Sequence, residues 1–255
     1  MKITFLGTGT SQGVPPIGCK SEVCLSLNPR DKRLRASIHL EWEGKSIVID
    51  SGPDFRYQMI RAGINQLDAI LFTHEHRDHT AGLDDVRSFN FIQKKSIPVY
   101  LHQRVYEVFQ SQYDYIFFPA PYPGIPQIDW HIIENNNFLL GDCEIKPVFV
   151  SHYKLPVLGF VFDKFAYVTD ANFISAEEKE KLKGMDVLVL NALRREPHIS
   201  HFTLSEAVSL AKELGAKQTY FTHMSHQIGL HDSVCAELPD GIDLAYDGLQ
   251  LILDA

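Results

Sequence analysis

The sequence lacks any long apolar run. No stretch of about 18 or more apolar residues occurs in the 255 residues, and the beginning of the chain has neither the basic start nor the long apolar segment of a secretory signal. These absences predict a soluble, cytoplasmic protein that has no membrane partner. Cysteine is also scarce. The four residues Cys19, Cys24, Cys143 and Cys235 are too few and too scattered for a disulfide framework, which favours a reducing compartment.

Positive charge is in short supply as well. The chain holds 24 lysines and arginines against 32 aspartates and glutamates, a formal net charge of −8, which argues against a protein built to bind nucleic acid nonspecifically. Because 45% of the residues are hydrophobic and no segment has the composition of a linker, residues 1–255 are predicted to form one domain with a large core. One stretch, residues 113–127, holds four prolines among aromatic residues and is predicted to be an irregular loop or lid.

Apolar runs of strand length recur along the chain, separated by turn residues and by segments with helical periodicity. One helix is expected over Asp54–Ala62, and two more begin at Ser175 and Thr203 with the Ser/Thr-x-x-Glu capping box. Hairpins followed by alternating strands and helices predict an α/β sandwich, in which two mixed sheets face each other and helices lie outside. Strands are expected at Lys2–Leu6, Ser37–Trp42, Lys45–Asp50, Asp68–Thr73, Ile97–Leu101, Ile128–Ile133, Cys143–Val150, Val157–Phe162, Ala166–Thr169, Val187–Leu190, Thr219–Thr222 and Leu249–Leu253.

Histidine is the residue in excess. Eight of the 12 histidines gather in "THEHRDH", "VSHY", "PHISH" and "THMSH". In the first of these, His74, His76, Asp78 and His79 follow directly on the predicted strand that ends at Thr73. Imidazole nitrogen and carboxylate oxygen are ligands that divalent metals such as zinc prefer, and so dense a polar cluster does not pack as a hydrophobic core. The motif therefore predicts a metal site at a strand end.

Three further candidate ligands also stand just after predicted strands, namely His152, Asp170 and His223. Because they share the strand-end position, we expect them to converge with the first cluster on one face of the molecule. Asp50 precedes the motif and is expected to orient a ligand histidine through the other nitrogen of its ring.

These motifs resemble the metallo-β-lactamase-fold hydrolases. Within that superfamily, "GTGTSQGVPPIGC", "THEHRDHTAGLDDVR", "VTDA", "THMSHQ" and "DGLQL" resemble the PhnP-like branch, named for the phosphoribosyl 1,2-cyclic phosphate phosphodiesterase. The resemblance spans nearly the whole chain and implies a four-layer αββα sandwich, two divalent metal ions (zinc or manganese) at the sheet edges, and a homodimer. The ligands it implies are His74, His76 and His152 for the first ion, Asp78, His79 and His223 for the second, and Asp170 as the bridge between them. Asp78 and Asp170 would then be catalytic carboxylates.

A leaving alkoxide needs a proton, and a histidine that binds no metal is the natural donor near neutral pH. His201, in "PHISHFTL", matches the position of such a histidine in the PhnP-like branch and is the candidate. His198 is the alternative donor, and a purely structural His201 is the other alternative. Guanidinium groups match the oxygens of a phosphate. The candidates for such a contact with the substrate are Arg77, Arg87, Arg194 and Arg195.

A further metal site is implied by resemblance alone. In the PhnP-like branch, the region of Cys19, Cys24 and His226 resembles a separate structural zinc site made of three cysteines and one histidine. Here the middle cysteine is absent and Ser21 stands near its place. Because a serine hydroxyl is a poor zinc ligand, the additional zinc is either completed by water or another residue, or lost.

The leading hypothesis is a dinuclear metal-dependent phosphodiesterase that cleaves a small, cyclic phosphodiester, with no nucleic-acid partner. One alternative is a polynucleotide phosphodiesterase like the tRNA 3′-processing endonucleases, although the net charge of −8 and the lack of a long basic arm stand against it. The other alternative is a biosynthetic member of the fold of the PqqB type, which is not a phosphodiesterase.

Overall fold

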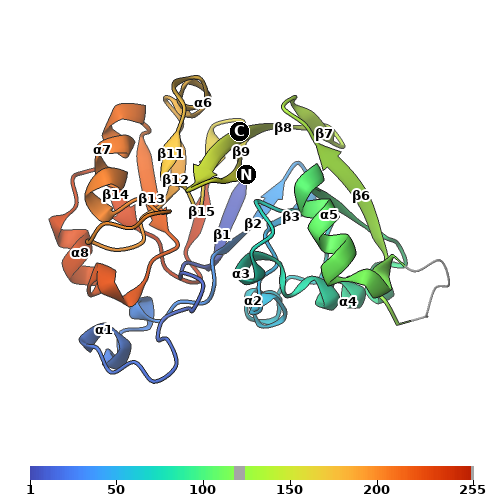
Figure 1. Cartoon of the computed structure of the whole chain (residues 1–255), viewed down its shortest axis with the longest axis horizontal. Coiled ribbons are helices and arrows are strands. Elements are labelled where there is room, and N and C mark those ends of the chain that lie inside the picture. Colours follow the sequence, from blue (N-terminus) through green and yellow to red (C-terminus); the bar gives the residue numbers. More distant parts are fainter. Residues whose placement is uncertain (118–123, 254–255) are drawn as a thin grey trace.

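Two β-sheets lie face to face in the middle of the molecule, and helices cover the outer face of each (Figure 1). The structure is a computed structural model that describes residues 1–117 and 124–253. Apolar side chains of both sheets meet in a central core that includes Phe5, Ile38, Phe160 and Tyr167. This four-layer arrangement confirms the predicted αββα sandwich.

The first sheet is antiparallel in its first half and parallel in its second. In the order β15-β1-β2-β3-β4-β5-β6, neighbours are antiparallel as far as β3 and parallel from β3 to β6. The strands are β1 (Lys2–Gly7), β2 (Ser37–Trp42), β3 (Lys45–Ile49), β4 (Ala69–Leu71), β5 (Ile97–His102), β6 (Ile128–Ile133) and β15 (Gln250–Ile252).

The second sheet repeats this plan. In the order β11-β8-β9-β10-β12-β13-β14, neighbours are antiparallel as far as β10 and parallel from β10 to β14, and β7 also pairs with β8. Both sheets are therefore mixed, as predicted. The strands are β7 (Phe138–Leu140), β8 (Cys143–His152), β9 (Leu155–Phe162), β10 (Phe165–Tyr167), β11 (Phe173–Ile174), β12 (Val187–Asn191), β13 (Gln218–Thr222) and β14 (Ile242–Leu244).

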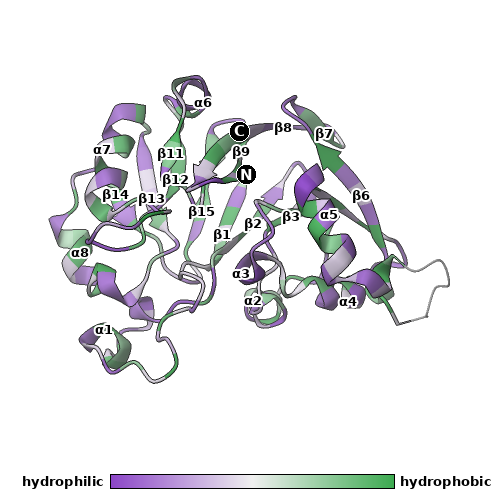
Figure 2. Ribbon diagram, in the orientation of Figure 1, coloured by the Kyte–Doolittle hydropathy of each residue, from purple (hydrophilic) through white to green (hydrophobic). Residues whose placement is uncertain are grey.

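The helices of the outer layers present one apolar face to a sheet. Figure 2 shows them banded between hydrophilic and hydrophobic residues, as expected of elements with one buried side. None of the described helices is long and apolar enough to cross a membrane. The helices are α1 (Glu22–Leu25), α2 (Phe55–Ala62), α3 (Arg77–Thr80), α4 (Arg87–Gln93), α5 (Gln103–Gln112), α6 (Ala176–Leu182), α7 (Leu204–Leu214) and α8 (His231–Glu237).

Local sequence signals place several element ends correctly. Helix α2 follows Asp54 and ends at Gly63, whose φ of 67° is left-handed and suits glycine. At α7 the capping box of Thr203 is complete. At α6 only the Ser175 half forms, because the Glu178 carboxylate instead accepts from the backbone N–H of Phe149, 2.9 Å away.

Other predicted elements differ from the structure. The strand expected over Asp68–Thr73 is only Ala69–Leu71, because the N–H of Thr73 donates to the side chain of Asp50 and not to a neighbouring strand. The loop predicted over 113–127 contains a 3-10 turn at Asp114–Ile116, and the Phe117 ring stacks on Trp130 with centroids 5.2 Å apart. Residues 118–123 of that loop lie outside the described part of the chain.

Candidate metal centre

The candidate ligands lie where strands of both sheets end. His74 and His76 belong to the loop after β4, while Asp78 and His79 lie in the first turn of α3. From the second sheet, His152 is the last residue of β8, and Asp170 and His223 follow β10 and β13. Asp170 and His223 have left-handed backbones, with φ of 52° and 57°. Such conformations are rare outside glycine and concentrate at functional sites.

Asp170 stands at the centre of the group. Its Oδ2 lies 3.2 Å from Nε2 of His79, and its Oδ1 lies 3.2 Å from Nε2 of His223. Asp78 faces the same two rings, at 3.2 Å from His79 and 3.5 Å from His223. The Asp170 side chain is only 2% exposed, so a carboxylate is held in the interior between imidazoles from both sheets.

The remaining histidines form the other side of the group. The ring of His74 is 4.5 Å from that of His76 and 5.9 Å from that of His152, between centroids, and His76 is 5.2 Å from His152. His74 is buried whereas His76 is exposed, so the group meets solvent on the His76 side. The seven residues that the sequence singles out are thus brought together.

Hydrogen bonds to the Nδ1 atoms orient three of the rings. The carboxylate of Asp50 lies 2.7 Å from Nδ1 of His79, as the sequence predicts for Asp50. Nδ1 of His152 donates to the carbonyl of Ser200, 2.8 Å away. Nδ1 of His74 lies 2.9 Å from the hydroxyl of Thr73, which itself donates to Asp50. These partners keep a proton on Nδ1 of all three rings, so Nε2 is the nitrogen left to face a ligand.

Several inward-facing nitrogens make no hydrogen bond, although those of His79 and His223 lie 3.2 Å from carboxylate oxygens of Asp170. Among the described residues, buried nitrogen atoms without a hydrogen bond include Nε2 of His74 and of His79, Nδ1 of His201, and both ring nitrogens of His223. A buried polar atom without a partner carries a large desolvation cost in most proteins. Several lone pairs converging on two carboxylates fit divalent metal ions, which would satisfy them together.

The electrostatics of the group also call for a cation. Burial alone would lower the pKa of His79, but the charges of Asp170, Asp78 and Asp50 outweigh it and hold this pKa well above its usual value. Burial would raise the pKa of Asp170, and the charges of His223 and His79 hold it well below its usual value instead. The site therefore keeps Asp170 ionised and, without another cation beside it, favours a proton on His79.

His201 and His198 differ in burial. Nδ1 of His201 lies 3.8 Å from Oδ1 of Asp170, and its ring is 4.5 Å from that of His152. Burial and the charge of His223 lower the pKa of His201 to about 2, so its imidazole is neutral in the free protein. His198 is half-buried, with its ring 5.1 Å from that of His201.

The arginines expected near the substrate mostly serve the protein itself. Arg194 donates to the carbonyls of Glu196 and Pro197 and to the side chain of Gln227. Arg195 donates to the carbonyl of Ile228 and to Glu237. Arg77 is exposed beside the cluster, where it contacts Gln112 and lies over the ring of Tyr113.

Two glycines that the sequence analysis does not single out, Gly52 and Gly82, let the candidate metal-binding loop pack tightly. A Cβ at Gly52 would lie 2.0 Å from the carbonyl oxygen of Asp78, and one at Gly82 would lie 2.3 Å from that of Gly52. Only glycine permits such approach of backbones. The signal available in the sequence was the position of these glycines beside Asp50 and after the histidine motif.

A second group of candidate ligands joins His226 to the segment between β1 and β2 (residues 8–36), here called the N-terminal lobe. Ligand atoms of Cys19, Cys24 and His226 all lie within 4.8 Å of one another, and the buried Nδ1 of His226 has no partner. Donors about 2.0–2.3 Å from one ion would be this close, so the three side chains fit a zinc ion. The Ser21 hydroxyl caps α1 and lies 3.4 Å from the sulfur of Cys19.

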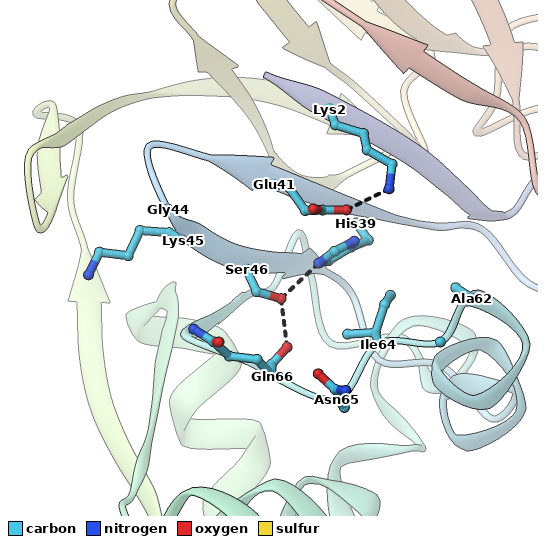
Figure 3. Close-up of a pocket in the computed structure, with 11 residues that line it drawn as sticks. Lys2, His39, Glu41, Gly44, Lys45, Ser46, Ala62, Ile64, Asn65 and Gln66 are labelled. Atoms are coloured by element: carbon cyan, nitrogen blue, oxygen red, sulfur yellow. Dashed lines mark hydrogen bonds and ion pairs between the residues drawn. The ribbon is translucent and has the colours of Figure 1, made fainter.

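A pocket of about 370 Å³ lies elsewhere, on the first sheet beside the loop that follows α2 (Figure 3). At its floor, the hydroxyl of Ser46 donates to the carbonyl of Gln66 and accepts from Nε2 of His39. Burial lowers the pKa of His39 to about 4, so this imidazole is neutral. The Ser46 hydroxyl and Nε2 of His39 have their partners within the protein, unlike the unpartnered ring nitrogens of the candidate metal centre.

Comparison with known proteins gives the following relatives. A family model described as "Beta-lactamase superfamily domain" matches residues 45–224. The chain is 39% identical over 257 aligned residues to an octanoyltransferase of Porphyromonas gingivalis (strain ATCC BAA-308 / W83), an alignment that covers the whole chain and 52% of that protein. The chain spans about half the length of the curated relatives it matches.

Solved structures match along the full chain. A structure described as a new diphosphatase from the PhnP family superposes with a TM-score of 0.93 at 42% identity, covering 99% of this chain and 98% of that one. Zn²⁺-bound PqqB from Methylobacterium extorquens superposes with a TM-score of 0.78 at 17% identity, covering 99% and 100%. The second likeness shows the fold alone.

Proposed function

Because the chain belongs to the beta-lactamase superfamily and to its PhnP family, we propose that this hydrolase uses two divalent metal ions to cleave a small, cyclic phosphodiester. The observation that carries the proposal is the set of buried imidazole nitrogens without partners around Asp170 and Asp78. The fold family implies divalent metals, and these donors fit zinc or manganese. Nucleic acid is not the proposed substrate, because the net charge is −8.

The proposed ligands divide between two ions. His74, His76 and His152 would hold one and Asp78, His79 and His223 the other, with one oxygen of Asp170 turned toward His79 and the other toward His223. When bound, the two ions would lower the pKa of the attacking water and withdraw charge from the phosphoryl group. Asp50, Thr73 and Ser200 keep the ring tautomers that this arrangement requires.

His201 is the proposed proton donor to the leaving oxygen. It lies within the cluster, beside His152 and Asp170, and it is not one of the seven proposed metal ligands. Because burial and the charge of His223 hold the pKa of His201 below its usual value in the free protein, the proposed donor would take up its proton when substrate binds. An anionic phosphodiester beside the ring favours the imidazolium and acts against the cost of burial.

A second candidate activity is hydrolysis of a phosphoanhydride. It is favoured by one observation, the 42% identity to a protein described as a diphosphatase. The two reactions share the same attack on phosphorus but differ in the leaving group, since a phosphate leaves readily whereas an alkoxide needs a proton. The octanoyltransferase name describes a protein of about twice this length and supports no acyl transfer here.

Turnover assays on matched substrates test the proposal. Enzyme loaded with Mn²⁺ or Zn²⁺ is given cyclic phosphodiesters, linear phosphodiesters and diphosphates at one concentration, with phosphate release or ring opening followed by ³¹P NMR. We expect the highest kcat/KM for a small cyclic phosphodiester. Preference for the diphosphates would select the second candidate, and no turnover of any of them would refute both.

The proposal includes a third ion at Cys19, Cys24 and His226, whose donor atoms converge in the N-terminal lobe. These residues lie outside the dinuclear cluster, so the ion would hold the lobe against the segment around His226. Metal analysis of chelator-free protein is expected to find about three ions per chain. Wild-type protein that carries only two, with both thiols reactive, would show that this site is lost.

A further inference from the structure

Asn172 stands between the two loops that carry His152 and His201. It lies two residues after Asp170, and its Oδ1 accepts from the backbone N–H of Tyr153, 2.7 Å away. Its Nδ2 donates to the carbonyl of Ile199, at 3.1 Å. These partners are 19 and 27 residues away along the chain, so one side chain links two distant loops.

The link runs beside a direct contact between the same loops. Nδ1 of His152 donates to the carbonyl of Ser200 at 2.8 Å, and the next residue along the first loop and the previous residue along the second, Tyr153 and Ile199, are those that Asn172 joins. The two loops are therefore held at successive positions, once by a candidate ligand and once by an amide that binds no metal.

Both loops need such support. Tyr153 has a left-handed φ of 58° in the turn between β8 and β9, and its side chain is 52% exposed. Ile199 is 66% exposed, so little apolar packing fixes it. Because few apolar contacts restrain these exposed loops, a hydrogen bond between them is expected to limit their motion.

Backbone hydrogen bonds fix the position of Asn172 itself. Its N–H donates to the carbonyl of Ser151 at 2.9 Å. The N–H of the preceding Ala171 donates to Oδ1 of Asn191 at 2.7 Å, and Nδ2 of Asn191 donates to the carbonyl of Ala171 at 2.9 Å. The N–H of Phe202, next to His201, also donates to the carbonyl of Ala171. Residues 170–172 thus join the central carboxylate to the backbone on which His201 stands.

We infer that Asn172 is a positioning residue, which fixes the loop of residues 198–201 against the turn after β8 and so holds the His201 ring at its 4.5 Å separation from His152. The inference rests on the proposed function only in the expectation that catalysis depends on His201. The effect of Asn172 on the position of His201 does not depend on which substrate is cleaved.

The first experiment measures that placement directly. In Zn²⁺-loaded protein, the imidazole NMR signals of His201 are assigned by their loss in His201→Ala. In Asn172→Ala these signals are expected to shift or broaden, while those of His39, in the distant pocket, stay unchanged. Unchanged His201 signals in Asn172→Ala would overturn the inference, whatever the enzyme does.

The second experiment separates the two hydrogen bonds. Asn172→Asp keeps an acceptor for the N–H of Tyr153 but places a carboxylate oxygen against the carbonyl of Ile199, so it should lose at least as much kcat as Asn172→Ala, roughly 10–100-fold. Metal content and KM should stay near wild type. Full activity of Asn172→Asp would show that the contact with Ile199 has no role, and loss of metal would assign Asn172 to the metal site.

A double-mutant cycle shows whether Asn172 acts through His201. Added to His201→Ala, Asn172→Ala should change turnover of the cyclic phosphodiester by less than about twofold, because residues that act through one group are not additive. Independent, multiplying losses would refute the inference. If His201→Ala alone leaves turnover unchanged, the proton-donor role fails, and the NMR result still decides the placement. Asn137→Ala, which removes one exposed hydrogen bond to Glu144, is the matched control.

Discussion

The two groups of candidate ligands in this molecule are built differently. The strand-end group draws side chains from both sheets, and its central carboxylate, Asp170, is almost completely buried. The group in the N-terminal lobe has three donors, two of them in and just before the four-residue helix α1 and one, His226, in a 3-10 turn. Only the first has rings oriented by other buried side chains, such as Asp50 and Thr73.

The difference shows what a fold supplies to a metal site. At the strand ends the sheets fix the positions of the donors, and the desolvated carboxylates already favour positive charge before any ion arrives. In the lobe, the donors stand on a small apolar cluster that includes Val14, Val23 and Cys24, so we expect part of the binding free energy of an ion to be used to order this segment. We therefore expect the strand-end site to hold its metals more tightly.

The largest effect is expected from removing the central carboxylate. Asp170→Asn keeps the shape of the side chain and tolerates the left-handed φ of 52°, but it removes the charge between the two proposed ions. Turnover should fall to the uncatalysed background and at least one ion should be lost, while circular dichroism stays that of the folded protein. Asp170→Ala should give the same result.

Asp163→Asn is the matched control, because Asp163 has the same left-handed φ of 52° in a turn of the second sheet. It should keep both metals and full turnover. Retention of both metals and full activity in Asp170→Asn would remove Asp170 from the site and erase the contrast between the two groups.

The next effect concerns His201, which is in the strand-end group but has no counterpart in the lobe. His201→Ala should keep both metals and slow substrates with alkoxide leaving groups by about 10²–10⁴-fold, the usual contribution of a general acid. A phosphodiester with a p-nitrophenolate leaving group, and a diphosphate, need less protonation and should lose far less.

Equal losses on all three substrates, at unchanged metal content, would instead assign His201 to binding the phosphate or shaping the loop. If none of the three rates changes, His198, whose ring is 5.1 Å away, becomes the candidate donor and is compared in the same way.

Much of the strand-end group follows from the sequence because every member stands at one repeated position. His152, Asp170 and His223 each come just after an apolar run, and parallel strands bring their carboxyl ends to one edge. Its fine structure does not follow. Ser200 orients His152 through a backbone carbonyl, which any residue type offers, so the sequence carries no signal for that contact.

The same holds for the fold. The long strands and the helix ends at Gly63 and Thr203 have strong local signals, and the prediction of mixed sheets is confirmed. Strand β11, with two residues, and β14, with three, are too short for any periodicity to mark them. They are set by pairing with longer strands, which is a property of the folded chain.

A smaller effect tests the orienting shell that distinguishes the strand-end group. Asp50→Asn removes the charge that holds Nδ1 of His79, while the hydrogen bond from Thr73 can persist. Metal affinity, measured by competition with a chelator, should fall about 10–100-fold, with a comparable loss of turnover at limiting metal.

Asp129→Asn provides a matched control, since Asp129 makes a similar contact of 2.9 Å to His131 but is exposed. It should change neither quantity. An unchanged metal affinity in Asp50→Asn would show that burial of the donors, without their orientation, accounts for the difference between the two groups.

The smallest effect is expected in the lobe, where a fourth donor can be added. Ser21→Cys places a third thiol beside the sulfur of Cys19, which now lies 3.4 Å from the Ser21 hydroxyl, and a structural zinc site prefers four donors. The variant should keep its third ion at chelator concentrations that strip wild type, and Cys24→Ser should lose it. Turnover should change less than about twofold in both, because the dinuclear cluster is untouched.

Cys143→Ser is the matched control, because it replaces a buried thiol in another part of the described chain, and it should leave metal content unchanged. A wild type that resists the chelator as firmly as Ser21→Cys would show that three donors suffice and that the lobe site is as well ordered as the strand ends.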